Sequence, residues 1–400
     1  MASVVDTSVK NFNSTMAGAP ALSGTAGSWI ALFDAVGVNG FDLKTPTSLS
    51  VAGGVATLSF TGSHSAQVDS VIAVSGSSIA ALNGEQKVTA VGAGFVKFAT
   101  AAADGVASGS ISFKMAPLGF SKLFAGPNLA AYRSSDMTST NCVLRVDDTS
   151  AQFARVVGYE SMSDINTGVG AFPSASQMAG GGYWAKSVNS NATAVSWFLI
   201  GDGRIFYFGV SPGYSSSTAN LIGSIRCFGD IVPERPGGDA YGCVLNYGVT
   251  SSPTASMSDG EIGSAQITQF QTAMPREYTG LGSAVLNSVL YLGQTSNNYS
   301  GVTGGMGSFP SKASGGLWLL AKAVCGSGDS TPRGILPGCY HVPQSGVFTS
   351  FKQGDVAPGA DMLAGRNLVA AYNSAAVAMS IAATAANCGI SFFDRTGPWR

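Results

Sequence analysis

The segments Ala194-Val-Ser-Trp-Phe-Leu-Ile200 and Ile205-Phe-Tyr-Phe-Gly-Val210 flank the short connection Gly201-Asp-Gly-Arg204. Both flanks are apolar at consecutive positions, whereas a strand with one face in water alternates apolar and polar residues. The Asp-Gly pair between them is a strong signal for a tight hairpin turn. This stretch therefore predicts a β-hairpin that has protein packed against both of its faces.

The region around this hairpin, residues 118–400, is also rich in predicted strands, which are separated by long loops of Ser, Gly and Asn. Short runs rich in β-branched and aromatic residues, bounded by turn-forming residues, are typical of strands. We expect such strands at 143–146, 153–159, 224–228, 242–247 and 315–321. Residues 118–400 are therefore predicted to form the larger β-rich domain of a mainly β protein.

Residues 41–117 show a clearer period of two, which is typical of strands with one buried face. Gly, Asn and Asp separate the short apolar–polar runs, and Pro117 closes the segment. Several short strands at this spacing predict a small β-sandwich or barrel. Two stretches carry the alternation most clearly: Ala56, Leu58 and Phe60, and Ile111, Phe113 and Met115.

Residues 1–40 predict an N-terminal arm with one short helix. Ser28 is the expected N-cap and Gly37 the expected stop. The apolar residues between them recur at helical spacing, and so short a helix must pack on the chain or on a partner subunit. We take them as a candidate assembly contact, so deleting residues 1–40 is expected to leave a folded protein that no longer assembles. They are Trp29, Leu32, Phe33 and Val36.

The composition is unusual in its lack of charge. Asp, Glu, Lys and Arg make up 11% of the 400 residues, and the formal net charge is -1; an ordinary soluble domain holds about 25%. The simplest explanation is a surface largely covered by copies of this chain or by other proteins. The balance of charge gives no reason to expect a nucleic-acid or membrane partner. The start of the sequence has no secretory signal pattern, so we expect synthesis in a cytoplasm and free, buried cysteines.

Few residues suggest chemistry. The two histidines, His64 and His341, lie outside any zinc-binding spacing, so we expect no metal and no cofactor. A Cys339–His341 pair would lie on one face of a strand without forming a catalytic dyad. Paired carboxylates could hydrolyse glycosides, although the acidic turns are more simply explained by local hydrogen bonds. The candidates are Asp147, Asp148, Asp202, Asp230, Glu234 and Asp239. We do not expect an enzyme.

The loop in residues 228–239 has the most unusual composition. It holds three acids, one arginine and two prolines within an otherwise uncharged chain. It is either a rigid loop in which Arg235 pairs with an acid, or a loop that binds a ligand or a partner. With 12 Tyr and 5 Trp, the chain also has aromatic residues that could stack on sugars. The candidate loop residues are Asp230, Glu234, Arg235 and Asp239.

Seven sequence blocks, in their order along nearly the full length, resemble a poorly characterised family of tailed-bacteriophage virion structural proteins. They are Val5-Asp-Thr-Ser-Val-Lys-Asn-Phe-Asn-Ser-Thr-Met16, Asn83-Gly-Glu-Gln-Lys-Val-Thr-Ala-Val91, Arg155-Val-Val-Gly-Tyr-Glu-Ser-Met162, Phe228-Gly-Asp230 with Gly238-Asp-Ala-Tyr241, Thr279-Gly-Leu-Gly-Ser-Ala-Val285, Arg333-Gly-Ile-Leu-Pro-Gly-Cys-Tyr340 and Asp394-Arg-Thr-Gly-Pro-Trp-Arg400. The resemblance carries over no catalytic residue.

The resemblance implies a component of the virion, in the tail or baseplate, whose partners are copies of itself and other virion proteins. Large apolar interfaces between subunits would account for the uncharged surface. Three other functions remain open at this point. They are a tail-tip module that binds a host-surface glycan or receptor, a capsid decoration protein, and a polysaccharide depolymerase.

Overall fold

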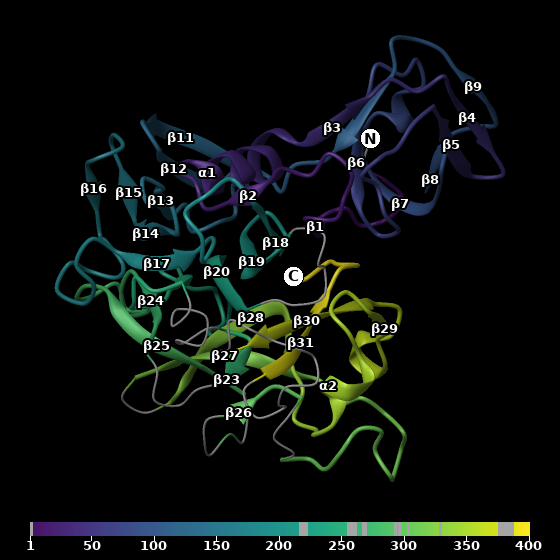
Figure 1. Cartoon of the computed structure of the whole chain (residues 1–400). Coiled ribbons are helices and arrows are strands. Elements are labelled where there is room, and N and C mark those ends of the chain that lie inside the picture. The colour runs from purple at the N-terminus through teal and green to yellow at the C-terminus, as the bar shows by residue number, and fades with distance from the viewer. Residues whose placement is uncertain are drawn as a thin grey trace.

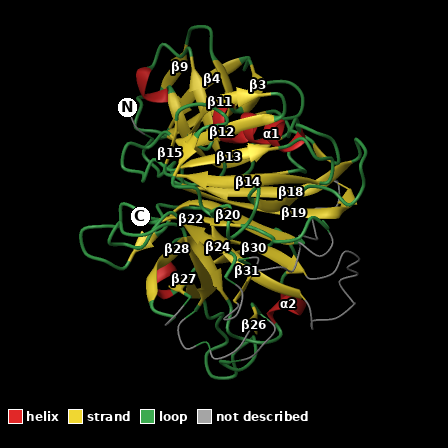
Figure 2. Ribbon diagram, turned by 90° about the vertical axis from the view of Figure 1, so that its left-hand side faces the viewer, coloured by secondary structure: helices red, strands yellow, loops and turns green. Residues whose placement is uncertain are grey.

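The computed structural model describes residues 3–215, 223–253, 262–265, 270–291, 294, 298–301, 305–327, 330–374 and 388–400. The protein is mainly β, as predicted, with every strand pairing antiparallel and only short helices (Figures 1 and 2). The strands form three larger sheets and two small two-stranded ones. None of the helices described is long and apolar enough to cross a membrane.

The largest sheet has fourteen strands and runs through most of the chain. Two strands lie off its main path: β2 (Leu22–Ser23), which pairs with β18, and β21 (Val232–Pro233), which pairs with β28. The main path, in spatial order, is β1 (Lys10–Asn13), β18 (Ala194–Gly201), β19 (Ile205–Ser215), β20 (Ser224–Asp230), β22 (Cys243–Asn246), β24 (Thr272–Met274), β25 (Val285–Leu290), β27 (Leu320–Gly326), β28 (Pro332–His341), β31 (Cys388–Asp394), β30 (Asn367–Ser374) and β29 (Val356–Pro358).

Further strands form smaller sheets, and the helices are short. A five-stranded sheet has the order β11 (Phe120–Gly126), β12 (Leu129–Ser134), β13 (Val143–Asp147), β14 (Phe153–Tyr159) and β17 (Gly182–Ala185). The small pairs are β15 (Ser161–Met162) with β16 (Gly168–Val169), and β23 (Ser264–Ala265) with β26 (Asn298–Tyr299). Among the described residues, the helices are α1 (Ser28–Phe33), a π-helix (Asp34–Asn39), α2 (Val347–Ser350) and two 3-10 turns (Ala80–Leu82, Asp361–Leu363).

The predicted hairpin is β18 and β19, and both of its faces are buried. Leu199 lies opposite Phe208, and Ile200 opposite Tyr207. Trp197, Leu199, Phe206 and Phe208 belong to the core cluster under the five-stranded sheet, whereas Phe198, Ile200, Ile205 and Tyr207 belong to a second cluster with β27, β28, β30 and β31. The large sheet therefore curls so that its later strands cover the second face of the hairpin.

The first 40 residues belong to this body and do not form a separate arm. β1 pairs with β18 from Lys10 opposite Gly201 to Asn13 opposite Phe198. The four residues predicted as an assembly contact are wholly buried in their own chain, where aromatic rings from several sheets surround them, so they form no surface for a partner. These residues, each 0% exposed, are Trp29, Leu32, Phe33 and Val36.

The start of α1 also differs from the prediction. Gly27 is the N-cap, and the hydroxyl of Ser28 donates to the carbonyl of Ser23 instead of capping the helix. The N–H groups of the first turn that have no partner within the helix are satisfied by Asp148, whose Oδ2 accepts from Trp29 N at 2.8 Å and from Ile30 N at 3.1 Å. A carboxylate here also complements the positive end of the helix dipole.

Asp148 forms an ion pair with Lys186, and neither side chain is exposed to solvent. The lysine Nζ also donates to the carbonyls of Thr25 and Ser150, at 2.7 Å each. Burial raises the pKa of Asp148 and lowers the pKa of Lys186, with their mutual attraction acting in the opposite direction. The simple local turn predicted here exists only at Asp147, whose Oδ1 accepts from Thr149 N and Oγ1.

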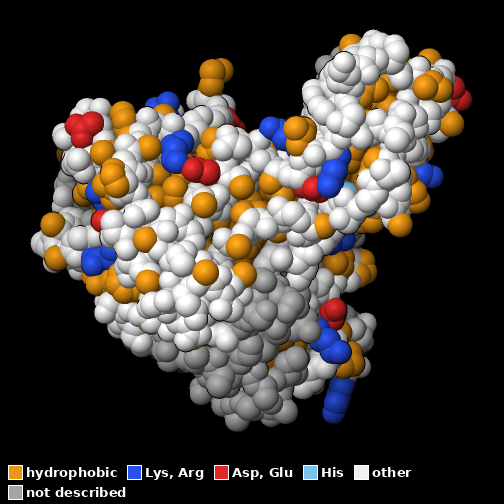
Figure 3. All heavy atoms as spheres, turned by 45° about the horizontal axis from the view of Figure 1, so that its top comes forward, with side chains coloured by type: hydrophobic (Ala, Val, Ile, Leu, Met, Phe, Trp, Pro, Cys, Tyr) orange, Lys and Arg blue, Asp and Glu red, His pale blue; other side chains and the backbone are white. Residues whose placement is uncertain are grey.

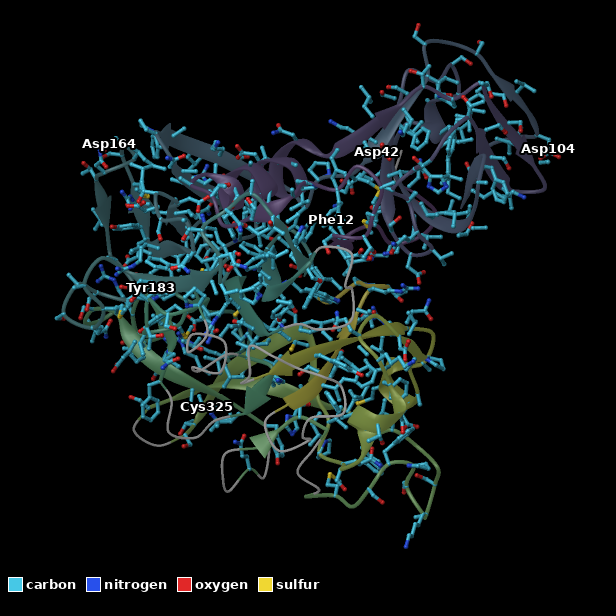
Figure 4. The ribbon with its side chains drawn as sticks, viewed as in Figure 1. Phe12, Asp42, Asp104, Asp164, Tyr183 and Cys325 are labelled. Atoms are coloured by element: carbon cyan, nitrogen blue, oxygen red, sulfur yellow. The ribbon has the colours of Figure 1, made fainter. Side chains whose placement is uncertain are left out.

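The small β-rich module, β3 to β10, is an eight-stranded sheet that curls upon itself. Its order is β3 (Phe41–Lys44), β10 (Ser112–Met115), β6 (Val71–Ser75), β7 (Gly84–Gly92), β8 (Phe95–Ala99), β5 (Val55–Ser59), β4 (Ser48–Ala52) and β9 (Gly105–Ala107). The long strand β7 changes register between Val88 and Ala90, where the sheet turns. The module projects from the body, and Phe12 lies near the junction (Figures 1 and 4).

The module is an insertion whose two ends meet in the body. Leu118 N donates to Val36 O at 2.8 Å, and Gly119 N donates to Gly37 O at 3.1 Å. The chain thus leaves the body after the π-helix, builds β3 to β10 and returns beside its point of departure. Such an arrangement is the one in which inserted units are best tolerated.

The last residues of the sequence join the module to the body. Arg395 pairs with Asp69 of the module at 2.9 Å, and its carbonyl accepts from Lys87 Nζ at 3.0 Å. Arg400 Nε pairs with Asp202 in the turn of the hairpin at 2.7 Å. The segment therefore connects the module to the hairpin around which the body is built.

Candidate binding groove

The loop singled out in the sequence follows β20 and leads through β21 into β22. β21 pairs with β28, with Val232 opposite Ile335 and Pro233 opposite Gly334. Proline is tolerated in such a short pairing at the margin of a sheet. This pairing fixes the start of the loop against the body, and residues 234–239 extend from it.

Asp230 and Asp239, two of the predicted site residues, serve as structural anchors. Asp230 is 3% exposed and accepts from Thr140 N at 2.9 Å and Thr140 Oγ1 at 2.6 Å, while Arg204 lies 3.2 Å away. Asp239 accepts two bonds from Arg333, from Nε at 2.7 Å and from Nη2 at 3.2 Å. Their carboxylates are therefore occupied in holding the loop.

Glu234 and Arg235 are the exposed members of the predicted set. Neither forms an ion pair with any residue that the structure describes, so the alternative in which Arg235 pairs with an acid is not found among these residues. The guanidinium lies instead over the ring of Tyr278, 5.3 Å from its centre. A cation over a tyrosine face is an attractive contact worth about 0.5–1 kcal/mol at an exposed position.

These two residues form part of the rim of a groove with a volume of about 820 Å³. Glu277 and Tyr278 lie across from them, between β24 and β25, and Val285, Leu286 and Asn287 of β25 also line it. The remaining lining residues are Asp239, Gly326, Ser327, Thr331, Pro332 and Arg333. Cys325, labelled in Figure 4, directly precedes the groove residue Gly326.

Sequence reasoning missed Glu277 and Tyr278. The signal was present, because Pro275-Arg-Glu-Tyr278 is a second cluster of charge beside a proline in a chain that has little charge. The feature that singles out residues 228–239, charged residues beside a proline, is therefore present in residues 275–278 as well. That the two clusters share one groove depends on the register of β24 and β25, which is a property of the folded sheet.

The other residues considered as catalytic candidates lie where they support the fold. Asp202 accepts from the N–H groups of Arg204 and Ile205 in the hairpin turn, at 3.0 Å each. Cys339 and His341 are both wholly buried, and the His341 ring stacks on Tyr291 with centres 4.0 Å apart. Burial lowers the pKa of His341 to about 2, which keeps the ring neutral. Among the described residues, no three His, Cys, Asp or Glu side chains cluster as a metal site would require.

Comparison with known proteins gives little further information. No family model and no curated protein matches the sequence. Among solved structures, one that is similar is the phage phi92 endosialidase, at 9% sequence identity and a TM-score of 0.17. The match covers 88% of this chain and 51% of that one, so the chain spans about half the length of this neighbour. A likeness of this size carries no argument about activity.

Proposed function

We propose that the chain is a structural component of a tailed-phage particle, in its tail or baseplate, and that it acts through contacts between subunits and not through catalysis. The observation that carries the proposal is the projecting module β3 to β10. Its two ends meet in the body, although its core is continuous with that of the body, and its outer strands present edges that are unpaired among the described residues.

The two ends of the curled sheet are β3 and β9, and neither pairs with a second strand among the described residues. Each carries an exposed apolar side chain, Leu43 at 68% and Val106 at 74% exposure. Open edges are templates for strands of another chain, and soluble proteins usually protect them with charge or cover. β9 has no charged residue, whereas β3 carries Asp42 and Lys44, which form an ion pair at 2.9 Å, so β9 is the less protected edge. A neighbouring subunit that adds a strand here would supply hydrogen-bond partners for the backbone groups of the edge and would cover the apolar side chains.

The wider surface supports the same proposal. Figure 3 shows hydrophobic side chains scattered over the face in view, with few charged ones between them. Exposed apolar residues also occur outside the module, for example Met137 at 94% and Met362 at 98%. Subunit interfaces are depleted in charged residues at their centres, so a chain with this surface is suited to burial in an assembly.

Quantitative mass spectrometry of density-purified particles tests the proposal by counting copies per virion. A small multiple of three supports a place at the baseplate or tail tip. Hundreds of copies would instead indicate a tube or shell component, such as a capsid decoration protein. Absence from the purified particles would contradict the proposal.

A further inference from the structure

We propose that the groove between the 234–239 loop and Tyr278 is a binding site for an uncharged, N-acetylated oligosaccharide. This inference does not depend on where the chain lies in a particle. It rests on four properties of the groove: a fixed frame, unpaired polar groups on its rim, apolar surface within it, and the sign of its charge.

The frame of the groove is held by ion pairs and does not need a ligand to form. Arg333 is fixed by its two bonds to Asp239, whose side chain is 1% exposed, and it also donates to Arg276 O at 2.5 Å. Arg276 in turn pairs with Glu160 at 2.6 Å. These contacts join the loop, the β24–β25 connection and β28, so a ligand would bind to a largely preformed surface, which reduces the cost of ordering.

The rim keeps hydrogen-bonding groups available for a ligand. The carboxylates of Glu234 and Glu277 make no ion pair with any described residue, and both residues are exposed. Carboxylates accept hydrogen bonds only, so they fit the hydroxyl and amide N–H groups of a sugar. The Arg235 guanidinium supplies donors on the same rim.

Apolar surface lies beside these polar groups. The Tyr278 ring is 55% exposed, and Val285 and Leu286 are partly buried where they line the groove. The Arg235 guanidinium lies over one face of this ring. The face that it leaves uncovered, together with the hydroxyl, matches the C–H face and the hydroxyls of a pyranose. Val285 and Leu286 follow one another on β25 and pack on opposite faces of the sheet, so one of the two side chains can receive the methyl of an acetamido group. The volume is within the range of about 300–1,000 Å³ common for small-molecule sites.

The charge of the groove rim favours neutral sugars over acidic ones. The pairing of Arg333 with Asp239 leaves two carboxylates and one guanidinium without an opposite partner among the described groove residues. The described part of the rim thus carries one excess negative charge, and an acidic saccharide would face like-charge repulsion. An acetamido group has no charge, and its N–H can donate to either carboxylate.

The full-length protein is titrated with chitotetraose, and binding is followed by saturation-transfer NMR and calorimetry. Maltotetraose tests the need for the acetamido group, and tetragalacturonate tests the sign of the charge. We expect the affinity to decrease from chitotetraose to maltotetraose to tetragalacturonate. Failure of chitotetraose to bind at about 10 mM, a level that detects even weak sites, would overturn the proposal, as would tighter binding of tetragalacturonate.

Two variants locate the site. Tyr278→Ala should weaken chitotetraose binding by about tenfold or more, equivalent to a loss of about 1.4 kcal/mol, and Glu277→Gln should weaken it less. Leu281→Ser is the matched control, because Leu281 is 71% exposed on the same connection and does not line the groove. Unchanged binding by Tyr278→Ala, or equal loss in Leu281→Ser, would place the sugar elsewhere and overturn the assignment.

Discussion

The hairpin β18–β19 and the module β3–β10 are both antiparallel β-structure, but they differ in how much of their surface the rest of the chain covers. The hairpin has apolar side chains on both faces, and both faces are covered by the same chain. The module buries one face of its sheet and leaves both edge strands without a further partner among the described residues. The hairpin therefore organises the core of the body, whereas the module leaves edge strands that can make contacts outside the chain.

Deleting residues 1–40 should have the largest effect. The deletion removes β1, the strand that covers the edge of β18, and it removes the buried rings of Trp29 and Phe33. We expect a protein without a cooperative thermal transition, because several large core side chains are lost together. Circular dichroism on heating measures this. A truncated protein that still unfolds cooperatively would show that the segment is a dispensable arm after all.

Asp148→Asn should come next, with a loss of about 3–5 kcal/mol in the free energy of unfolding, because it leaves the buried Lys186 charge without its partner. The neighbouring change Asp147→Asn should alter stability by no more than about 0.5 kcal/mol, since that side chain serves a turn at the surface. Urea denaturation of both variants makes the comparison. Equal effects of the two changes would mean that the pair does not support the body.

Lys87 joins the module to the body, and burial lowers its pKa to about 8. In the unfolded chain Lys87 titrates near its ordinary pKa of 10.5. Between these values the unfolded state binds more protons, so the contribution of Lys87 to stability rises with pH. We expect the free energy of unfolding of the wild type minus that of Lys87→Met to increase by about 2 kcal/mol from pH 7 to pH 10. A pH-independent difference would contradict the burial of this amine.

The double change Leu43→Ser with Val106→Ser should have the smallest effect on the isolated protein. Both side chains are exposed on edge strands, so the free energy of unfolding should change by no more than about 0.5 kcal/mol. In the particle the same variant should be incorporated less well, which quantitative mass spectrometry measures. Normal incorporation would show that these two side chains are not part of the proposed contact.

The sequence allowed the fold class to be predicted because the patterns are local. The apolar run of residues 194–210 showed a hairpin covered on both sides, and the alternation after residue 41 showed strands with one buried face. The strand expected at 315–321 starts only at Leu320, and β28 was not predicted. β28 contains Pro332 and Pro337, residues that normally argue against a strand, and its pairing with β27 has register shifts that accommodate them.

Long-range contacts were beyond sequence reasoning. The helix cap comes from Asp148, more than a hundred residues away from α1, and no local pattern indicates it. The helical spacing of Trp29, Leu32, Phe33 and Val36 correctly indicated a buried face, but it did not tell whether the chain or a partner buries it. Of the loop residues, the sequence found Glu234 and Arg235, and it could not separate them from the anchors Asp230 and Asp239.

Replacing residues 41–116 with a short Gly-Ser linker separates the role of the module from that of the body. The linker can close the gap because the hydrogen bonds from Leu118 to Val36 and from Gly119 to Gly37 bring the two ends together. Thermal unfolding and copies per particle are measured on the same variant. We expect the body still to unfold cooperatively and the variant to be absent from particles. A body that does not fold, or a variant incorporated at the normal copy number, would contradict this expectation.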